Sequence, residues 1–502
     1  MLRLVCSNDK FEYDTYLLVK EFWPKEEIKR QNVGSDAFLK DSAAGGPDGD
    51  SSGEPFGDEV VIECLYDKCR TVITLAESDD SKEFKACAGC KRFEYPVPDG
   101  LDEKEYKKAH MRNLYLGLSE ITGIQLPWGN LTGVRPTKPA RQMYLDGATD
   151  GEVARFYKET RFVSDEKAAL ASEIAKREAK ILSAIDPING YSLYIGIPFC
   201  PTRCAYCSFL SNPIAKWQSR VDEYLGCLKK ELDFTKQAFA GKKLDTIYIG
   251  GGTPTALSAD ELKVLMEMLN PTPEGLLEFT VEAGRPDSIT REKLRVLKEA
   301  GVSRISVNPQ TMNEETLKRI GRAHTVEQTR EAFALAREEG FDNINMDLIL
   351  GLPGEGLREV EYTLSEVEKM RPDSLTVHSL AIKRSALMKE WVRGTGDEGH
   401  ATLAKLAYET AQRLNLNPYY LYRQKNIAGN LENVGFAKEG LYGIYNILMM
   451  EEVQSIVALG AGTVSKRVLS EKDISRCDTA KDIGLYMDNI DEMIARKKEL
   501  FC

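Results

Sequence analysis

The chain has 502 residues, a formal net charge of −11, and a hydrophobic content of 42%. This length allows about two to four domains with sizeable cores. The acidic balance disfavours nucleic-acid binding, and no run of about 18 apolar residues is present to span a membrane. Because the first residues lack the apolar stretch of a signal peptide, the eleven cysteines predict a reducing, cytoplasmic location. We expect a monomer.

Residues 1–100 predict a small α+β domain. The apolar runs at 1–6 and 58–66 are typical of strands, and residues 14–24 predict a helix that ends at its proline. Residues 43–59 are rich in Gly, Ser, Pro and Asp, which predicts a surface loop.

Four cysteines of this region follow the spacing C-x4-C-x17-C-x2-C: Cys64, Cys69, Cys87 and Cys90. They could form a zinc ribbon or hold a second cluster. Only the last pair has the close spacing usual for such sites. A chance arrangement of structural cysteines is therefore the favoured interpretation.

Residues 101–188 predict a helical connector, whose last helix spans 164–185. Before that helix, residues 126–147 are rich in turn-forming residues and carry three cations: Arg135, Lys138 and Arg141. Two interpretations stay open for this stretch. It is either a solvated connector or a segment that offers cations to substrate carboxylates.

From 189 to 385, strand-like runs alternate with helical ones, which is typical of βα units. Six strands are predicted, at 192–197, 246–251, 276–282, 304–309, 343–351 and 374–380. The helices are predicted at 218–239, 258–270, 290–300, 313–320, 325–339 and 358–370. The expected fold class is α/β, with a partial (β/α)6 TIM-like barrel whose functional residues lie at the C-terminal ends of the strands.

The first of these strands leads into a loop that carries Cys200, Cys204 and Cys207, a C-x3-C-x2-C spacing. Three thiolates so close in sequence suit one soft metal centre. A closed zinc site needs a fourth ligand, and no further candidate follows nearby. The spacing therefore predicts a [4Fe–4S] cluster with one open iron, against the alternative of three buried structural cysteines.

Glycines and polar residues follow the other predicted strands. Residues 250–255 read GGGTPT, and these glycines would let a ligand approach the backbone closely. Glu282, Gln310 and Asp347 stand at or within later strands. Arg322 lies in a GRAH stretch. Each could singly be a cap or a surface group, but one polar group per strand end is typical of a convergent pocket.

Residues 386–502 predict a C-terminal α+β extension that covers the substrate. Helices are predicted over 399–415 and 478–499. Between them, residues 418–430 contain four aromatic or basic candidates: Tyr420, Tyr422, Arg423 and Lys425.

The cysteine spacing, followed by GGGTPT, resembles the signature of the radical S-adenosylmethionine (SAM) family. In that family the open iron binds SAM, and an electron from the cluster cleaves SAM to a 5′-deoxyadenosyl radical. VEAGRPDSIT, NPQTMNEETLKRIGRAHT and MDLILGLPGE further resemble oxygen-independent coproporphyrinogen III oxidases. LPWGNLTGVRPTK, YYLYRQKNIAGNLENVGFA and ALGAGTVSK resemble the HemZ branch, coproporphyrinogen dehydrogenase.

The resemblance implies SAM contacts at the matching positions: Tyr194, Tyr206, Gly251, Gly252, Thr253, Glu282, Gln310, Arg322 and Asp347. Tyr194 is also the catalytic candidate, and Arg135 and Arg423 are the expected partners of substrate carboxylates. The implied reaction is the oxidative decarboxylation of two propionates of coproporphyrinogen III to give protoporphyrinogen IX. It needs an electron donor and an electron acceptor, which the sequence does not identify.

Two positions depart from the best-studied oxidases, which carry His where Gly196 stands and a fourth Cys where Phe209 stands. Radical SAM heme chaperones share the Phe. Their HNxxYW motif corresponds to residues 445–450, YNILMM, which lack its His and its Tyr-Trp pair. Three functions stay open: a coproporphyrinogen dehydrogenase, a heme chaperone, or a radical SAM enzyme acting on another tetrapyrrole.

Overall fold

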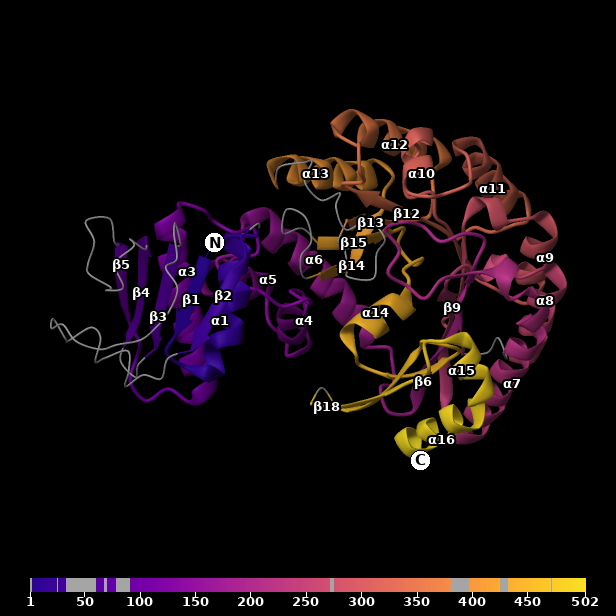
Figure 1. Cartoon of the computed structure of the whole chain (residues 1–502), viewed down its shortest axis with the longest axis horizontal. Coiled ribbons are helices and arrows are strands. Elements are labelled where there is room, and N and C mark those ends of the chain that lie inside the picture. The colour runs from indigo at the N-terminus through magenta and orange to yellow at the C-terminus, as the bar shows by residue number, and fades with distance from the viewer. Residues whose placement is uncertain are drawn as a thin grey trace, which may run out of the picture. The chain divides into compact units, whose positions relative to one another are not determined.

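The computed structural model describes residues 2–24, 26–32, 60–66, 70–77, 91–270, 275–380, 397–424, 432–470 and 472–502. The predictions for residues 43–59 and for Cys69, Cys87, Cys90 and Lys425 therefore lie outside the described residues. The chain divides into two compact units (Figure 1). The first comprises Met1–Pro136 and Gly147–Ser172, and the second Thr137–Asp146 and Glu173–Cys502.

The first unit is built on a five-stranded sheet with the order β2-β1-β3-β4-β5. Its strands are β1 (Leu2–Cys6), β2 (Ile28–Asn32), β3 (Val60–Tyr66), β4 (Arg70–Glu77) and β5 (Lys91–Pro96). Helices α1 (Asp9–Phe22) and α3 (Glu103–Thr122) share its apolar core. Cys64 is fully buried in that core. The predicted α+β fold of this region is confirmed.

Local sequence explains where α3 begins and ends. Asp102 accepts a bond from the Glu105 backbone N–H while the Glu105 side chain returns to the Asp102 N–H, which forms a capping box. At the other end Gly123 has a φ of 71°, a left-handed conformation that favours glycine. The following helices are α4 (Lys138–Leu145), α5 (Asp150–Arg155), continued by a π-helix (Phe156–Thr160), and α6 (Asp165–Leu182).

The second unit contains an eleven-stranded sheet with the order β14-β15-β13-β12-β11-β10-β9-β6-β16-β17-β18. Its six central strands are mutually parallel and confirm the six predicted strands. They are β6 (Gly190–Ile197), β9 (Lys243–Gly251), β10 (Glu278–Gly284), β11 (Arg304–Val307), β12 (Ile344–Leu350) and β13 (Ser374–Ser379).

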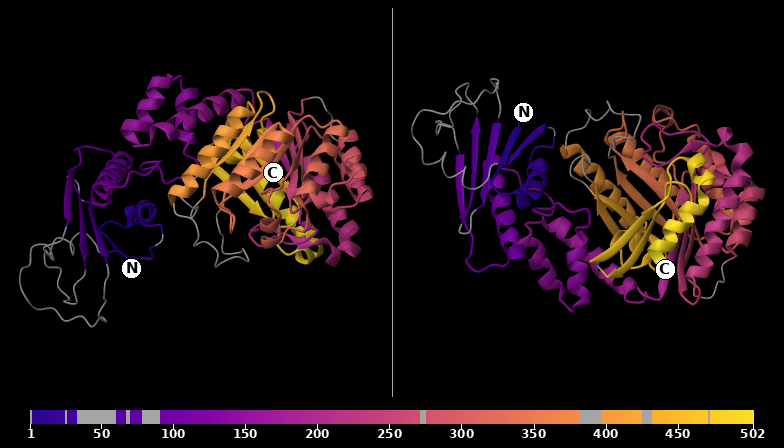
Figure 2. Two further views of the ribbon diagram at one scale, coloured as in Figure 1. Left: turned by 90° about the horizontal axis from the view of Figure 1, so that it is seen from above. Right: turned by 60° about the horizontal axis from the view of Figure 1, so that its bottom comes forward.

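The helices that connect these strands lie on the outer side of the sheet (Figures 1 and 2). They are α7 (Val221–Ala238), α8 (Ala259–Leu269), α9 (Arg291–Glu299), α10 (Glu314–Arg319), α11 (Val326–Glu338) and α12 (Leu357–Met370). Alternate strand residues such as Leu193, Ile247, Val281 and Met346 are apolar and fully buried. Since strand side chains alternate between faces, every second residue faces the inner, concave side.

The C-terminal residues extend the sheet at both edges. β14 (Asn417–Arg423) and β15 (Glu432–Ala437) join β13, whereas β16 (Ser455–Leu459), β17 (Val464–Ser470) and β18 (Asp473–Asp478) join β6. The remaining helices are α13 (Asp397–Arg413), α14 (Ile444–Glu451), α15 (Ile483–Asp488) and α16 (Ile490–Phe501). The predicted helix at 399–415 corresponds to α13. The predicted boundary at 385 lies outside the described residues.

The single helix predicted over 478–499 is wrong. Residue 478 ends β18, α15 starts only after Asp482, and the chain breaks again at Asn489. The Asp482 carboxylate accepts a bond from the Leu485 N–H, so it caps a new helix at that point.

Helix α14 packs against both β9 and β14, which are six places apart in the sheet order. One short helix can touch both strands only because the sheet curves strongly around it. Among the described strands the order is open, with β14 and β18 at its edges. The second unit therefore has the predicted α/β fold of a partial barrel. No described helix has the length and apolarity needed to cross a membrane.

Candidate functional site

Partly exposed residues stand out along the otherwise buried strands of the barrel. Four strands contain a single such residue each: Tyr194 in β6, Glu282 in β10, Asp347 in β12 and His378 in β13. Tyr248 in β9 and Tyr422 in β14 are likewise partly exposed between buried neighbours. We call these six residues the lumen row.

Strand register places the lumen row on one face of the sheet. Tyr194 pairs with Tyr248, and Tyr248 pairs with Thr280, two residues before Glu282. Thr280 also pairs with Arg304, and Ser306, two residues on, pairs with Asn345; the β10–β11 register shifts only between Val281 and Gly284. Asp347 then pairs with Thr376, two residues before His378. Because paired residues point to the same side of a sheet, the lumen row lines the concave face.

The cysteine loop begins where β6 ends. Cys200 and Cys204 are buried, and Cys207 is half-buried. The glycine loop after β9 is bonded to the start of this loop, since the Gly252 N–H donates to the Ile197 carbonyl and the Thr253 N–H to the Phe199 carbonyl, each at 2.7 Å. Thr253 Oγ1 also donates to Cys200 Sγ at 3.5 Å. The structure thus places the predicted ligand Cys200 beside two predicted SAM residues, Gly252 and Thr253.

Gly252 allows these two loops to approach each other. A Cβ at this position would lie 2.5 Å from the Phe199 carbonyl oxygen and 3.0 Å from Cys200 Sγ. The nearer atom belongs to the backbone and cannot rotate away. Gly251 adopts a φ of 105°, which L side chains rarely adopt.

The arrangement fits a cluster rather than a single ion. In the described part of the chain, no three His, Cys, Asp or Glu side chains surround one metal ion. A [4Fe–4S] cluster does not require this, because each thiolate binds a different iron atom. Burial raises the pKa of the Cys200 thiol to about 11, so its thiolate at neutral pH depends on a bound cation.

Arg285 binds the cysteine loop through Thr202. Sequence reasoning missed this arginine. Its Nη1 donates to the carbonyl and the hydroxyl of Thr202 at 3.0 and 2.6 Å, and its other donors bind Asp287. The spacing R-x-D directly after a predicted strand could have indicated a local guanidinium–carboxylate pair.

The predicted SAM residues beyond the glycine loop form two further groups. Arg322 is buried and donates to the Tyr206 hydroxyl at 3.1 Å. Gln310 has a φ of 70° and forms two backbone hydrogen bonds with β12. The Gln310 N–H donates to the Asp347 carbonyl, and the Ile349 N–H donates to the Gln310 carbonyl. Gln310 is therefore fixed next to Asp347.

Three tyrosine rings stack beside Glu282. The Tyr248 ring lies 6.2 Å from Tyr194 and 4.5 Å from Tyr445 of α14. The Tyr248 hydroxyl donates to Glu282 Oε1 at 2.5 Å. Burial raises the pKa of Glu282 to about 7, and this hydrogen bond opposes part of the rise.

The opposite side of the lumen row carries Asp347, His378 and Tyr422. Asn345 Nδ2 donates to Asp347 Oδ1 at 2.7 Å. The Tyr422 hydroxyl lies 3.4 Å from His378 Nδ1. Tyr248 and His378 were missed by sequence reasoning, although counting alternate positions along each strand could have found them.

Arg423, one of the two predicted substrate cations, is not part of the lumen row. Arg423 follows Tyr422 in β14, so strand alternation directs it to the opposite face, where only 5% of it is exposed. The position of Arg423 in β14 therefore does not favour its predicted contact with a substrate carboxylate at the pocket mouth. Arg135 belongs to the first unit, and its contact with substrate stays a prediction.

The structure also explains the departure at Gly196. A Cβ there would lie 2.6 Å from Thr463 Cγ2, so the methyl group of Thr463 fills the space of a side chain at position 196. Phe209, at the second departure, is exposed at the end of the cysteine loop.

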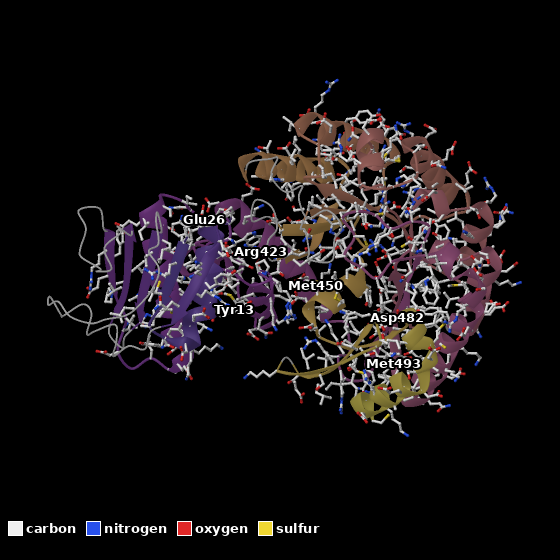
Figure 3. The ribbon with its side chains drawn as sticks, in the orientation of Figure 1. Tyr13, Glu26, Arg423, Met450, Asp482 and Met493 are labelled. Atoms are coloured by element: carbon white, nitrogen blue, oxygen red, sulfur yellow. The ribbon has the colours of Figure 1, made fainter. Side chains whose placement is uncertain are left out.

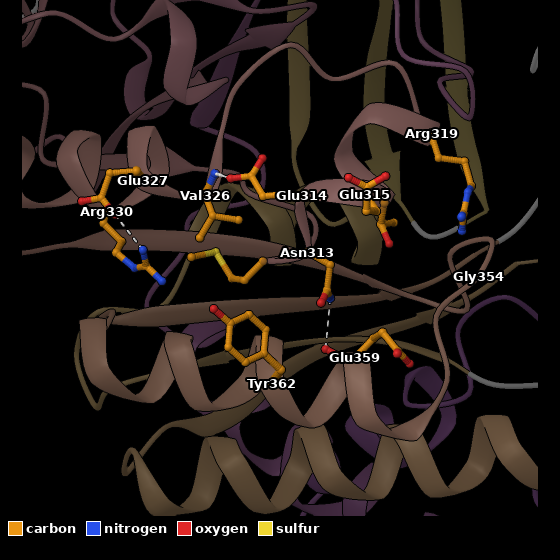
Figure 4. Close-up of a pocket in the computed structure, with 12 residues that line it drawn as sticks. Asn313, Glu314, Glu315, Arg319, Val326, Glu327, Arg330, Gly354, Glu359 and Tyr362 are labelled. Atoms are coloured by element: carbon orange, nitrogen blue, oxygen red, sulfur yellow. Dashed lines mark hydrogen bonds and ion pairs between the residues drawn. The ribbon is translucent and has the colours of Figure 1, made fainter.

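A separate pocket of about 550 Å³ lies among α10, α11 and α12 (Figure 4). Its walls include Glu314, whose carboxylate accepts the Val326 N–H, and the Glu327–Arg330 ion pair. No residue of the lumen row lines this pocket. It is thus distinct from the candidate site.

Comparison with known proteins agrees with this geometry. Residues 194–367 match the radical SAM superfamily. The chain is 44% identical over 383 residues to the oxygen-independent coproporphyrinogen-III oxidase-like protein HemZ of Bacillus subtilis (strain 168), covering 74% of this chain and 76% of that protein. It is also 43% identical over 196 residues to the heme chaperone HemW of the same organism, covering 38% of this chain and 51% of HemW.

Two further relatives match in part. Coproporphyrinogen III oxidase, anaerobic 1, of Cereibacter sphaeroides is 32% identical over 239 residues, or 46% of this chain and 52% of that protein. The structure of Escherichia coli coproporphyrinogen III oxidase (HemN) aligns with a TM-score of 0.49 at 21% identity, covering 63% of this chain and 73% of that chain. The chain belongs to the HemZ family of radical SAM proteins, whose cofactors are a [4Fe–4S] cluster and SAM.

Proposed function

We propose that this protein is a coproporphyrinogen dehydrogenase of heme biosynthesis, which converts two propionates of coproporphyrinogen III to vinyl groups without oxygen. One observation carries the proposal: a concave wall of tyrosines, carboxylates and one histidine continues from the cysteine loop along six strands. Such a wall suits a large, flat, polar macrocycle. Similarity over most of the chain to a coproporphyrinogen-III oxidase-like protein supports it.

Each decarboxylation has a simple balance. One hydrogen atom leaves the propionate β-carbon, carbon dioxide leaves the α-carbon, and one electron passes to an acceptor. When bound, the cluster and SAM supply the radical that takes the hydrogen atom. A cellular electron donor and an electron acceptor are therefore part of the proposal.

The chain's own residues bind and orient. Gly252 and Thr253 present backbone and hydroxyl groups next to Cys200, where SAM would be held. Glu282 and Asp347 offer acceptors from two sides of the lumen. The ring of Tyr194, in van der Waals stacking with its neighbours, excludes water beside them.

The first alternative, a heme chaperone, is less well supported. Tyr445 stands where the chaperones carry the His of their heme motif. It is only 6% exposed and stacks on Tyr248, so it is turned into the barrel rather than toward an external heme. Met450 and Met449 follow on the same helix (Figure 3) and remain the candidates for a heme ligand if the chaperone function holds.

The test is an anaerobic assay of the reconstituted protein with SAM, a reductant and coproporphyrinogen III. The product is oxidised and identified as protoporphyrin IX, and Cys204→Ser serves as the inactive control. A Soret band on adding heme, without turnover, would favour the chaperone. An oxygen-sensitive open cluster suits a reducing compartment, so the proposal places a monomeric enzyme in the cytoplasm.

A further inference from the structure

The lumen row contains residues with an expected role in SAM binding and two residues without an assigned role. Tyr194, Glu282 and Asp347 are expected SAM contacts, and Tyr248 hydrogen-bonds Glu282. His378 and Tyr422 have no such assignment. They lie beyond Asp347 along the sheet order β12-β13-β15-β14. Both are partly exposed and stand between buried neighbours in their strands.

The pair is held by its surroundings. The Tyr422 ring is stacked on Tyr420, at 6.2 Å and 12°, and a Cβ on Gly435 of the neighbouring strand would overlap the Tyr420 ring. Only glycine at 435 lets that ring lie flat on the sheet. Asn433, across from Tyr422, accepts the Ser379 N–H at 2.9 Å. These contacts hold the wall that carries His378 and Tyr422 in place.

Within the pair itself, either tautomer leaves one hydrogen that the other residue does not accept. If the Tyr422 hydroxyl donates to His378 Nδ1, the imidazole hydrogen sits on Nε2. If Nδ1 donates, the Tyr422 hydroxyl is released as the donor. Burial holds the pKa of His378 below its ordinary value, with Asp347 and Asn433 acting against this effect. The donor is thus a neutral one.

We propose that His378 and Tyr422 form the positioning pair for a carboxylate of the tetrapyrrole substrate, and specifically for the propionate that is decarboxylated. The proposal rests on the proposed function and names the residues that hold its substrate.

A neutral donor suits a carboxylate that must leave. The propionate carboxylate loses its charge as it becomes carbon dioxide, so an arginine would stabilise the bound substrate more than the transition state. A neutral imidazole or phenol orients the group at a smaller cost to the reaction. Asp347 lies two residues before the partner of His378 in β12, which sets the pair next to the expected SAM site.

The test compares five variants with the wild-type protein under anaerobic conditions. They are His378→Ala, His378→Gln, Tyr422→Phe, the double variant His378→Ala/Tyr422→Phe, and Tyr362→Phe, a matched control on the outer helix α12, where Tyr362 is exposed. KM and kcat for coproporphyrinogen III, SAM affinity, SAM cleavage without substrate, and Tm are measured.

His378→Ala should raise KM about tenfold, as expected for a lost hydrogen bond to a charged group. SAM affinity, substrate-free SAM cleavage and Tm should stay near wild-type values. His378→Gln keeps an N–H and should recover most of the loss. Because both residues share one donor, the double variant His378→Ala/Tyr422→Phe should be no more than about twofold worse than His378→Ala alone. Tyr362→Phe should behave as wild type.

An unchanged KM in His378→Ala overturns the proposal. A joint fall of SAM affinity and Tm with no recovery by His378→Gln does so too, since it marks a structural role. Fluorescence titration with coproporphyrin III and its tetramethyl ester separates this inference from the proposed function. A wild type that turns nothing over but binds the tetracarboxylate through His378 refutes the reaction and keeps the pair. A wild type that binds neither compound overturns both.

Discussion

Tyr248 donates a hydrogen bond to Glu282 across two neighbouring parallel strands, with 2.5 Å between the two oxygens. The acceptor is a carboxyl group whose pKa burial raises to about 7. A bond to the ionised form lowers a carboxyl pKa, so Tyr248 keeps Glu282 charged over more of the neutral range.

The first prediction concerns this bond. If SAM needs the Glu282 carboxylate, SAM affinity should rise with pH through about 7. Tyr248→Phe removes the bond, so the midpoint should move to higher pH. Equilibrium binding of SAM to the reconstituted protein between pH 5.5 and 8.5 measures both curves, with Tyr362→Phe as the control. Superimposable curves for Tyr248→Phe and wild type would contradict the assignment.

The second prediction concerns Gly252. Its missing Cβ faces the backbone of the cysteine loop rather than open ligand space. Gly252→Ala should therefore reduce both SAM affinity and the iron content after reconstitution. Iron and sulfide analysis alongside SAM titration tests this. A variant with full cluster content and only weaker SAM binding would mean that the loop can yield at Phe199.

The third prediction is a double-mutant cycle at Gly196 and Thr463. Gly196→Ala places a methyl group 2.6 Å from Thr463 Cγ2 and should cost about 1–3 kcal/mol as an overpacked core position. Thr463→Ser removes that methyl group and keeps the hydroxyl, which donates to the Gly460 carbonyl.

Adding Thr463→Ser should restore most of the stability lost in Gly196→Ala, as measured by thermal unfolding of all four proteins. Strictly additive losses would show that the two side chains do not compete for the same space.

The fourth prediction uses a buried carboxyl in the second unit. Glu178 of α6 is fully buried near Glu451, which forms an ion pair with Arg141 at 3.0 Å. Burial, reinforced by Glu451, raises the pKa of Glu178 well above its usual range. The stability that Glu178 contributes is thus present below its unfolded pKa and is lost as pH rises toward its folded pKa.

Glu178→Gln should accordingly gain Tm relative to wild type as pH rises from 5 to 8. A single carboxyl changes the free energy of unfolding by at most about 1.4 kcal/mol per pH unit. The same Tm difference at both pH values would show that Glu178 does not titrate in this range.

Much of the fold could be predicted because periodicity is local. The six strands, the helices between them and the cap at Gly123 follow from alternation, turn residues and capping signals. The helix predicted over 478–499 failed because its apolar spacing continues through Asp482, whose side chain caps a new helix instead. Local periodicity does not show where a capping residue begins a new helix.

The site was predicted unevenly for a related reason. Cys200, Gly252 and Asp347 stand out by spacing or by charge in an apolar run. Tyr248 and His378 do not, because aromatic residues are ordinary in buried strands. Arg423 was assigned by charge alone, whereas the register of β14 turns its neighbour Tyr422 inward. Only pairing across the sheet shows which face each residue takes.

The most direct test of the proposed reaction is its stoichiometry. Two propionates lose one hydrogen atom each, so the protein, reconstituted without oxygen and supplied with SAM, a reductant, an electron acceptor and coproporphyrinogen III, should form two molecules of 5′-deoxyadenosine and two of carbon dioxide per protoporphyrinogen IX. The formation of 5′-deoxyadenosine with neither carbon dioxide nor a vinyl product, under conditions where the cluster is intact, would contradict the account.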